Sequence, residues 1–270
     1  MQDIEVFGTP GQQMMQRKGE ALYSLLCDDP RFCSHGRGVQ ISDYTDQEET
    51  LDQILALANI LGASGCEKVP NDKAAELIAT VEGLGYITDT YSKYTGSAET
   101  IAIARQTLSD RALPEDLTLR TIDTDAPCEW VAGLAEVALE QGVLPSSGPV
   151  LRGISRPGFG MVAMDETGRP VATACAAMSR HKDHPDSGMA QWGQLATRDD
   201  RKGQGIARMM AAHSIVHAAD TLGTEVFSTG IRDGNAPSEN LCRSLGLRPS
   251  DYTIVIVIDP NGFDLDRATK

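Results

Sequence analysis

The stretch from Leu195 to Thr221 constrains the fold most, because a short apolar strand runs there through a glycine-spaced turn into a long helical pattern. Gly203 and Gly205 lie between the strand and the helix. Side chains recur at steps of three and four, the spacing of one helical face, at Ile206, Met209, Met210, His213, Val216 and Leu222. This succession predicts a helix whose first turn is open to a ligand.

The chemistry of that junction favours a phosphate. The first turn of a helix carries unpaired backbone N–H groups and a partial positive charge, and pyrophosphate is the usual ligand there. Only Asp199 and Asp200 oppose the basic residues of this turn, so we expect a local positive excess in a chain of net charge −14. These basic residues are Arg198, Arg201, Lys202 and Arg208.

Two familiar phosphate loops are excluded. No segment matches the Walker pattern, and Arg208 stands where the Rossmann fingerprint needs its third glycine. The hexapeptide Lys202-Gly203-Gln204-Gly205-Ile206-Ala207 resembles the [Q/R]xxGx[G/A] signature of the GCN5-related N-acetyltransferases (GNATs), with Lys202 in place of the usual Gln or Arg.

A second GNAT signature resembles the segment that follows. The family often has Asn, then Leu-Tyr, then Leu-Gly-Phe, and this chain has Asn235, Leu241-Cys242 and Leu245-Gly246-Leu247. Residues 117–270 read as β-α-β-β-β-α-β-α-β, which is also similar to the family. The resemblance implies a mixed α/β (α+β) fold in which helices flank a central, mostly antiparallel sheet.

The resemblance also implies a reaction. An acceptor amine attacks the thioester of acetyl-CoA directly, without an acyl-enzyme. The backbone of Leu195, Ala196 and Thr197 would pair with the pantetheine arm, and Asn235 would hydrogen-bond the cofactor. The pyrophosphate would be bound by Lys202, Gly203, Gln204, Gly205, Ile206 and Ala207.

The catalytic groups are less clearly marked. Cys242 occupies the position of the family's tyrosine acid, and a free thiol, which titrates near pH 8.5, could protonate a thiolate. The alternative is a buried helix cysteine, with the proton coming from solvent or another tyrosine. The strand Gly188–Thr197 lacks a central carboxylate, so the base would be water or a residue of another loop. Trp192 and Gln194 are candidates for the acceptor pocket.

The histidines offer competing readings. His213 and His217 are spaced for a metal on one helix face, but neither a third ligand nor an HExxH glutamate is evident, so no metal is expected. His181 and His184 lie with Asp183 and Asp186 in a polar turn that is either solvated or in contact with the acceptor.

Residues 1–116 are predicted as a helix-rich domain, followed by a GNAT domain at 117–270, with the boundary at Leu113–Asp116. Five elements are expected in the first domain: the helices Met14–Leu26, Leu51–Leu61, Asn71–Glu82 (with Asn71 as its cap) and Ala98–Leu108, and the strand Tyr86–Thr95.

An offset of about 161 residues aligns parts of the two domains, including Leu61-Gly62 with Leu222-Gly223, Leu84-Gly85 with Leu245-Gly246, and Tyr91 with Tyr252. In both, helix, strand, helix and strand follow in order. The first domain therefore reads either as a degenerate GNAT copy or as an independent unit. Its counterpart of the phosphate turn, Ile41–Asp46, lacks glycine and is not expected to bind CoA.

The composition limits the classes of partner. A pI near 4.7 argues against nucleic acid or an anionic membrane as the main partner. No apolar run approaches the length needed to span a membrane, and the N-terminus does not show the pattern of a signal peptide. Six scattered cysteines indicate free thiols in the cytoplasm. Two functions stay open: an N-acetyltransferase acting on a small-molecule amine, and a non-catalytic CoA-binding or protein-interaction module. The first domain would cap the site, form a homodimer, or be vestigial.

Overall fold

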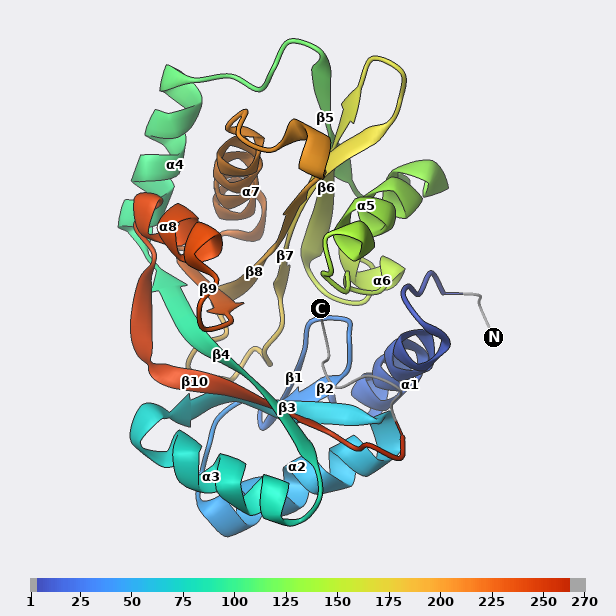
Figure 1. The fold of residues 1–270 in the computed structure, drawn as a ribbon, viewed down its shortest axis with the longest axis vertical. Helices are drawn as coiled ribbons and strands as arrows, with labels where there is room; N and C mark the ends of the chain where they lie inside the picture. Colours follow the sequence, from blue (N-terminus) through green and yellow to red (C-terminus); the bar gives the residue numbers. More distant parts are fainter. Residues whose placement is uncertain (1–3, 263–270) are drawn as a thin grey trace.

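In the computed structural model, which describes residues 4–262, ten strands form one sheet in the order β1-β2-β3-β10-β4-β9-β8-β7-β6-β5 (Figure 1). The strands are β1 (Phe32–Ser34), β2 (Val39–Ile41), β3 (Ala63–Pro70), β4 (Ile87–Gly96), β5 (Leu117–Ile122), β6 (Gly158–Asp165), β7 (Pro170–Met178), β8 (Met189–Thr197), β9 (Val226–Ile231) and β10 (Arg248–Ile258). Neighbours are antiparallel except β2 with β3 and β8 with β9, so the expected mostly antiparallel sheet is confirmed.

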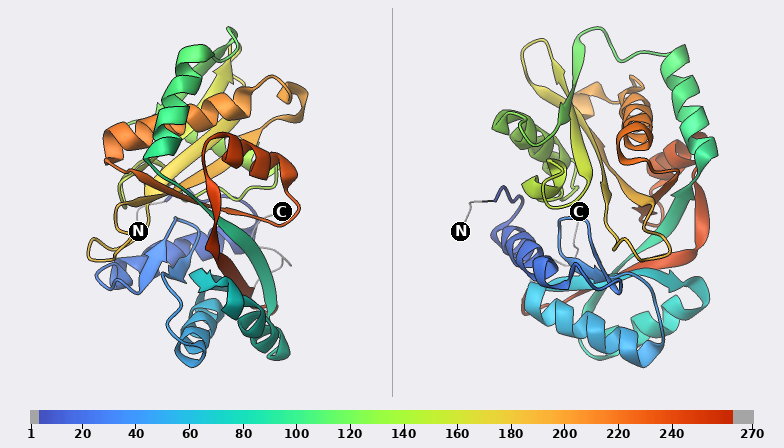
Figure 2. Two further views of the ribbon diagram at one scale, coloured as in Figure 1. Left: turned by 90° about the vertical axis from the view of Figure 1, so that its left-hand side faces the viewer. Right: turned by 180° about the vertical axis from the view of Figure 1, so that it is seen from behind.

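Helices cover this sheet on both sides (Figure 2). They are α1 (Pro10–Leu26), α2 (Gln47–Leu61), α3 (Asn71–Gly83), α4 (Ala98–Asp110), α5 (Cys128–Glu140), α6 (Gly148–Leu151), α7 (Ile206–Leu222) and α8 (Ala236–Ser244). No helix within residues 4–262 combines the length and apolar character needed to cross a membrane.

Strands β5 to β9 lie between two helical layers. The buried Trp192 of β8 donates its Nε1–H to Ser214 Oγ of α7 over 2.8 Å, which fixes α7 on one face. On the other face Cys175 of β7 packs in a core with Leu134 of α5 and Leu151 of α6. A second core lies at the other end of the sheet, where β3 and β10 meet α2 and α3.

The two halves of the chain exchange strands. β10, the last strand, lies between β3 and β4 of the first half, whereas β4 pairs with β9 of the second half. Figure 1 shows β4 and β10 crossing between the upper and lower groups of helices. The proposed boundary at Leu113–Asp116 falls in the connection between α4 and β5, but the sheet runs through both halves.

The offset of 161 residues also relates the elements on either side of this crossing. It carries α2 onto α7, β3 onto β9, α3 onto α8, and β4 onto β10. Gly62 and Gly223 end the matched helices α2 and α7 in the left-handed conformation, with φ of 87° and 67°. The topology therefore supports the interpretation of the first half as a second, partial copy.

The expected helices and strands are confirmed, with three corrections. The helix-rich prediction for the first half omitted the hairpin β1–β2, whose strands have three residues each and give too short a pattern to recognise. The expected loop Val143–Arg156 contains the short helix α6. Asn71 does not cap α3 but bonds to β10, where its Oδ1 accepts from Thr253 Oγ1 over 2.9 Å.

Candidate functional site

The glycine-spaced turn lies open to solvent between β8 and α7. After β8 a short 3₁₀ helix, Asp199–Arg201, leads to Gly203 and Gly205, which have φ of 80° and 77°. That left-handed conformation favours glycine. A Cβ at either position would meet no heavy atom within 4 Å, so the space in front of both residues is open.

The amides of this turn are available. Gly205 begins α7 without a side-chain cap, and Lys202 N–H bonds to Asp199 O over 3.3 Å. From Gly203 to Ala207, no acceptor in the described chain pairs with a backbone N–H. The start of α7 therefore offers a row of unpaired donors and the positive end of the helix dipole, as expected for a phosphate site.

The expectation of excess positive charge around the turn is wrong, because three of its four basic residues are paired with carboxylates. Arg198 is paired with Glu136 and Glu140 of α5. Arg201 Nη1 lies 2.9 Å from Asp116 Oδ2, and Lys202 Nζ lies 2.5 Å from Asp199 Oδ1. Most of the opposing carboxylates are distant in sequence, so local charge counting missed them. Arg208 has no acidic partner among the described residues; its Nη2 bonds to Thr107 Oγ1 over 3.5 Å, and its Nε is buried without a partner.

Strands β8 and β9 separate beside this turn. They pair at three positions only, from Met189–Val226 to Gln191–Ser228. Arg198 N–H bonds to Val171 O, and backbone groups alternate along an antiparallel ladder. Ala196, opposite Thr173, therefore points its backbone groups toward β7, whereas Leu195 and Thr197 point theirs toward the open side.

A β-bulge at Gln194-Leu195 accompanies the separation, because the register with β7 shifts between Thr173 and Cys175. Gln194 has φ of 51° and is the only non-glycine residue with positive φ in the described chain. Its side chain is held by Ser146: Nε2 donates to Ser146 Oγ over 2.6 Å, and Oε1 accepts from Ser146 N–H over 3.0 Å. Thr173 Oγ1 also donates to Gln194 O over 2.9 Å.

Cys242 and Asn235 lie at the two ends of α8. Cys242 is 4% exposed in the hydrophobic core, and burial raises its pKa to about 12. These surroundings are typical of a structural cysteine, and a catalytic role for it stays a prediction. Asn235 caps α8, with Oδ1 accepting from Ser238 N–H over 3.3 Å, so the cofactor contact predicted for Asn235 stays untested.

The geometry supports two other sequence candidates poorly. Trp192 lies beneath α7 with its N–H satisfied, which is the position of a core tryptophan rather than of an acceptor contact. His217 packs edge-on against Phe159, with ring centroids 4.5 Å apart, and burial lowers the pKa of both His213 and His217. Within the described residues, no group of His, Cys, Asp and Glu could hold a metal ion.

The polar turn after β7 makes structural contacts. His184 Nε2 pairs with Asp43 Oδ2 over 2.5 Å, and Asp186 Oδ2 accepts from Lys68 Nζ over 2.7 Å. His181 Nδ1 lies 3.8 Å from Asp183 Oδ2. The turn therefore joins the two halves of the chain, and an acceptor contact there stays untested.

The first half's counterpart of the phosphate turn differs from the second. Asp46 caps α2, with its side chain accepting from Glu49 N–H, so a carboxylate occupies the place of a bound anion. Asp43 adds a second carboxylate nearby, within 3.5 Å of Lys68 Nζ. This negative charge opposes phosphate binding, which agrees with the expectation from the missing glycines.

A buried ionic cluster was missed by sequence reasoning. Glu67 Oε1 lies 2.8 Å from His35 Nε2, and Glu67 Oε2 lies 3.2 Å from Lys93 Nζ. Burial, the largest single effect, raises the pKa of Glu67, but Lys93, His35 and Arg180 together outweigh it, so the pKa of this carboxyl group is lowered. Burial lowers the pKa of His35 to about 4, so the ring is neutral near pH 7. A charged residue within the apolar strand β3 was the signal available.

This cluster lies near a broad polar face of the sheet. Side chains of directly opposed residues share a face, and Gln191 opposes Ser228, which opposes Thr95. Cys175 and Lys93 fall on the same side by the two-residue alternation. We call Cys175, Gln191, Ser228 and Lys93 the polar face; it lies opposite α7. Ser228 Oγ is buried there without a partner.

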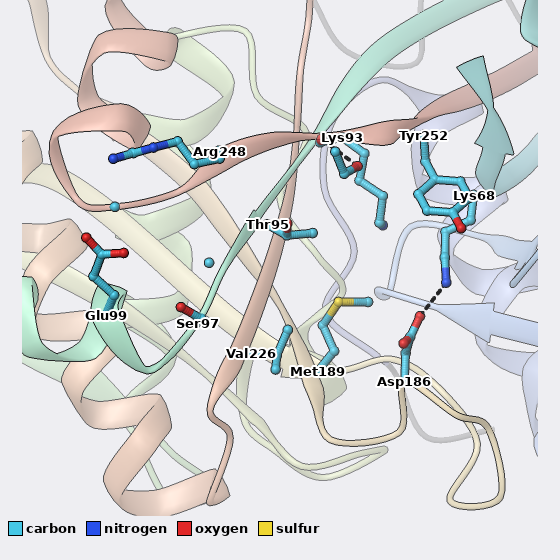
Figure 3. Close-up of a pocket in the computed structure, with 13 residues that line it drawn as sticks. Lys68, Lys93, Thr95, Ser97, Glu99, Asp186, Met189, Val226, Arg248 and Tyr252 are labelled. Carbon is cyan, nitrogen blue, oxygen red and sulfur yellow. Dashed lines mark hydrogen bonds and ion pairs between the residues drawn. The ribbon is translucent and has the colours of Figure 1, made fainter. Parts of the chain in front are cut away.

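A cavity of about 500 Å³ lies at the starts of β8 and β9, away from the phosphate turn at the end of β8 (Figure 3). It is lined by Lys68, Lys93, Thr95, Gly96, Ser97, Glu99, Asp186, Met189, Val226, Gly246, Arg248, Ser250 and Tyr252. In Figure 3, Lys68 reaches Asp186 across one side of this cavity. The separated strands and the open helix turn, rather than this cavity, match the predicted cofactor site.

Comparisons with known proteins agree on the fold. A family model described as "Acetyltransferase (GNAT) family" matches residues 131–247. The chain is similar to a GCN5-related N-acetyltransferase from Kribbella flavida (14% identity, 92% of this chain and 96% of that one, TM-score 0.55). It is also similar to a Drosophila protein (14% identity, 93% and 90%, TM-score 0.58). A third structure is a tandem GNAT protein from the clavulanic acid biosynthesis pathway, without AcCoA (14% identity, 78% and 67%, TM-score 0.51). No curated protein matches the sequence.

Proposed function

Because residues 131–247 match the GNAT acetyltransferase family and the fold is similar to that of GNAT proteins, we propose that this chain is an acetyl-CoA-dependent N-acetyltransferase that acetylates the amine of a small molecule. The observation that carries the proposal is the row of unpaired amides from Gly203 to Ala207 beside the separated ends of β8 and β9. A phosphate donor site and an open strand edge side by side suit a cofactor that has a pyrophosphate and an amide-bearing arm.

In this proposal the pyrophosphate lies on the amides between Gly203 and Ala207. Lys202, whose side chain is 57% exposed, can exchange its surface pair with Asp199 for a phosphate oxygen. The backbone groups of Leu195 and Thr197 on the open side pair with the pantetheine amides. Their alternation favours these two residues over Ala196 as the pairing partners.

Transfer then proceeds by direct attack. The amine nitrogen attacks the thioester carbonyl carbon, the carbon–sulfur bond breaks, and the nitrogen loses a proton while the departing thiolate gains one. The pairing of β8 with β9 ends at Gln191, shortly before the bulge at Gln194-Leu195 where the thioester would lie, and Ser146 holds Gln194 in that shape. Water or a residue of another loop takes the proton from the amine.

A second candidate function is a CoA-binding or protein-interaction module without catalysis. The buried Cys242 at the position of the family's tyrosine favours it, because a thiol with a pKa of about 12 is a poor replacement for a solvent-connected acid. The acidic pI of about 4.7 disfavours nucleic acid as a partner of either candidate. Six free cysteines support a cytoplasmic location.

Two measurements test the proposal. Isothermal titration of acetyl-CoA into the full chain should give heat with a one-to-one stoichiometry, and thiol release should follow when small primary amines are added. Binding without thiol release across the amine panel would favour the module. An absence of acetyl-CoA binding would overturn the acetyltransferase and the CoA-binding module, and only a protein-interaction module would remain.

A further inference from the structure

The hairpin loop His35–Gly38, between β1 and β2, carries an arginine without a partner. The Nε atom of Arg37 is sealed from solvent and has no acceptor. Its two Nη atoms also lack acceptors among residues 4–262, but they are not sealed, so they face solvent-accessible space. Other arginines in the cores of this chain are paired, such as Arg152 with Glu5 and Arg156 with Glu20. Arg156 and Arg208 also have a buried Nε without an acceptor, but both bond through their Nη atoms, whereas Arg37 makes no side-chain hydrogen bond or ion pair within residues 4–262.

The loop that carries Arg37 is held firmly. His35 Nε2 bonds to Glu67, and His35 O accepts from Ser146 Oγ. Gly36 O accepts from Ser147 N–H over 2.8 Å. Because Ser146 also holds Gln194 at the bulge of β8, one serine fixes the loop of the first half and the bulge of the second half relative to each other.

The guanidinium of Arg37 lies within electrostatic range of the polar face. It interacts electrostatically with Cys175 of β7, Tyr91 of β4 and Glu67 of β3. Cys175 lies opposite Gly193, beside the bulge, so the charge of Arg37 acts on the region where the thioester would lie, on the side of the sheet opposite α7. Glu67 makes no hydrogen bond to Arg37; its two oxygens bond to His35 and Lys93, so the Nη donors of Arg37 are left for a ligand.

A fixed, partly buried guanidinium whose Nη donors are unpaired matches the fork geometry of a carboxylate. We propose that Arg37 binds the carboxylate of the acceptor, so that the substrate is an amine that also carries a free carboxylate, such as an amino acid. This inference rests on the proposed acetyltransferase function. The anion belongs to the acceptor and not to the cofactor, because the amides of the phosphate turn lie at the start of α7, away from the polar face.

The kinetic test uses matched acceptors and matched variants. Amino acids and their carboxamides are compared at saturating acetyl-CoA for the wild type, Arg37→Gln, Arg37→Lys and Arg31→Gln. Arg31 is a more exposed arginine on the same hairpin, paired with Asp29 at 2.6 Å, so its variant controls for the loss of charge. The wild type and Arg31→Gln should prefer carboxylates by roughly tenfold or more in kcat/KM, the usual value of a charge-assisted pair. Arg37→Gln should lose this preference through KM and keep the wild-type Kd for acetyl-CoA. Arg37→Lys should recover part of it.

A binding measurement keeps the inference separate from the proposed activity. In spectra of the arginine Nε–H groups, the sealed Nε–H of Arg37, assigned by its absence from Arg37→Gln, should shift with N-acetylglycine and not with N-acetylglycinamide. If acetyl-CoA neither binds nor reacts but this shift occurs, the proposed function fails and the carboxylate site stands. The proposal is overturned if both probes or neither shift the signal. It is also overturned if Arg37→Gln keeps the preference for carboxylates, or weakens acetyl-CoA binding instead.

Discussion

Replacement of Gly205 by alanine separates the requirements of the backbone from those of the ligand. Gly205 has φ of 77°, and an added Cβ would meet no heavy atom within 4 Å, so the unliganded protein has room for the methyl group. Gly223, at the other end of α7, has φ of 67° and equally open surroundings. Gly223→Ala therefore imposes similar backbone strain on the same helix without touching the phosphate turn.

The two variants should lose similar amounts of stability. A non-glycine residue in the left-handed region costs about 1–2 kcal/mol, partly offset by the smaller entropy of the unfolded chain, about 0.4–1 kcal/mol. The net loss of roughly 1 kcal/mol corresponds to a fall in Tm of about 2–4 °C for a chain of this size. Differential scanning calorimetry should give nearly equal shifts for Gly205→Ala and Gly223→Ala.

Only Gly205→Ala should weaken cofactor binding. A methyl group in front of the amides hinders the approach of a phosphate, and one charge-assisted hydrogen bond is worth about 1.5–3 kcal/mol. The Kd for acetyl-CoA, measured by isothermal titration calorimetry, should therefore rise roughly ten- to a hundredfold for Gly205→Ala and stay within about twofold for Gly223→Ala. Equal affinities in the two variants would refute the assignment of the phosphate to this turn.

Three further predictions follow from the same structure. In urea denaturation, Gln194→Gly should be more stable than Gln194→Ala by about 1 kcal/mol. Both variants lose the hydrogen bonds to Ser146, but only the alanine variant keeps the strain of a positive φ. A higher stability of Gln194→Ala would contradict this reasoning. Cys242→Ala should keep turnover within about threefold of the wild type while its Tm falls, because the thiol is buried and has a pKa of about 12. If the folded variant lost more than about tenfold in turnover, the thiol would instead be the general acid. The free energy of unfolding should rise by roughly 3 kcal/mol between about pH 4 and pH 6.5. In that window His35 is protonated in the unfolded chain but neutral in the folded chain, where its pKa is about 4. If His35→Gln had the same pH profile of stability, the titration would belong to other groups.

Local patterns were sufficient to predict most elements of the second half. The periodic apolar face after Ile206 and the glycines before it gave α7 and its open first turn, because both depend on neighbouring residues alone. The register of β10 could not be predicted this way. Its pairing with β3 and β4 joins residues far apart in sequence, and an apolar strand does not specify which partners it meets.

The same difference between local and long-range features applies to the candidate site. The residues of the candidate phosphate turn could be proposed from the sequence because their motif is contiguous. Arg37 could not, because its proposed role depends on a short hairpin, on Ser146 from the other half of the chain, and on the lack of an acceptor bonded to its guanidinium within residues 4–262. The neutralisation of Arg198 by Glu136 and Glu140 was missed for the same reason, since spatial neighbours, not sequence neighbours, set the charge of a site.

The strand exchange also has a consequence for how the protein is made. The neighbour that β3 requires is β10, which is synthesised long after it. Until β10 is made, the emerging first half has an unsatisfied edge that invites aggregation, and its closure depends on contacts of very long sequence separation. Completion of the fold should therefore be slow, and the incomplete first half should benefit from chaperones.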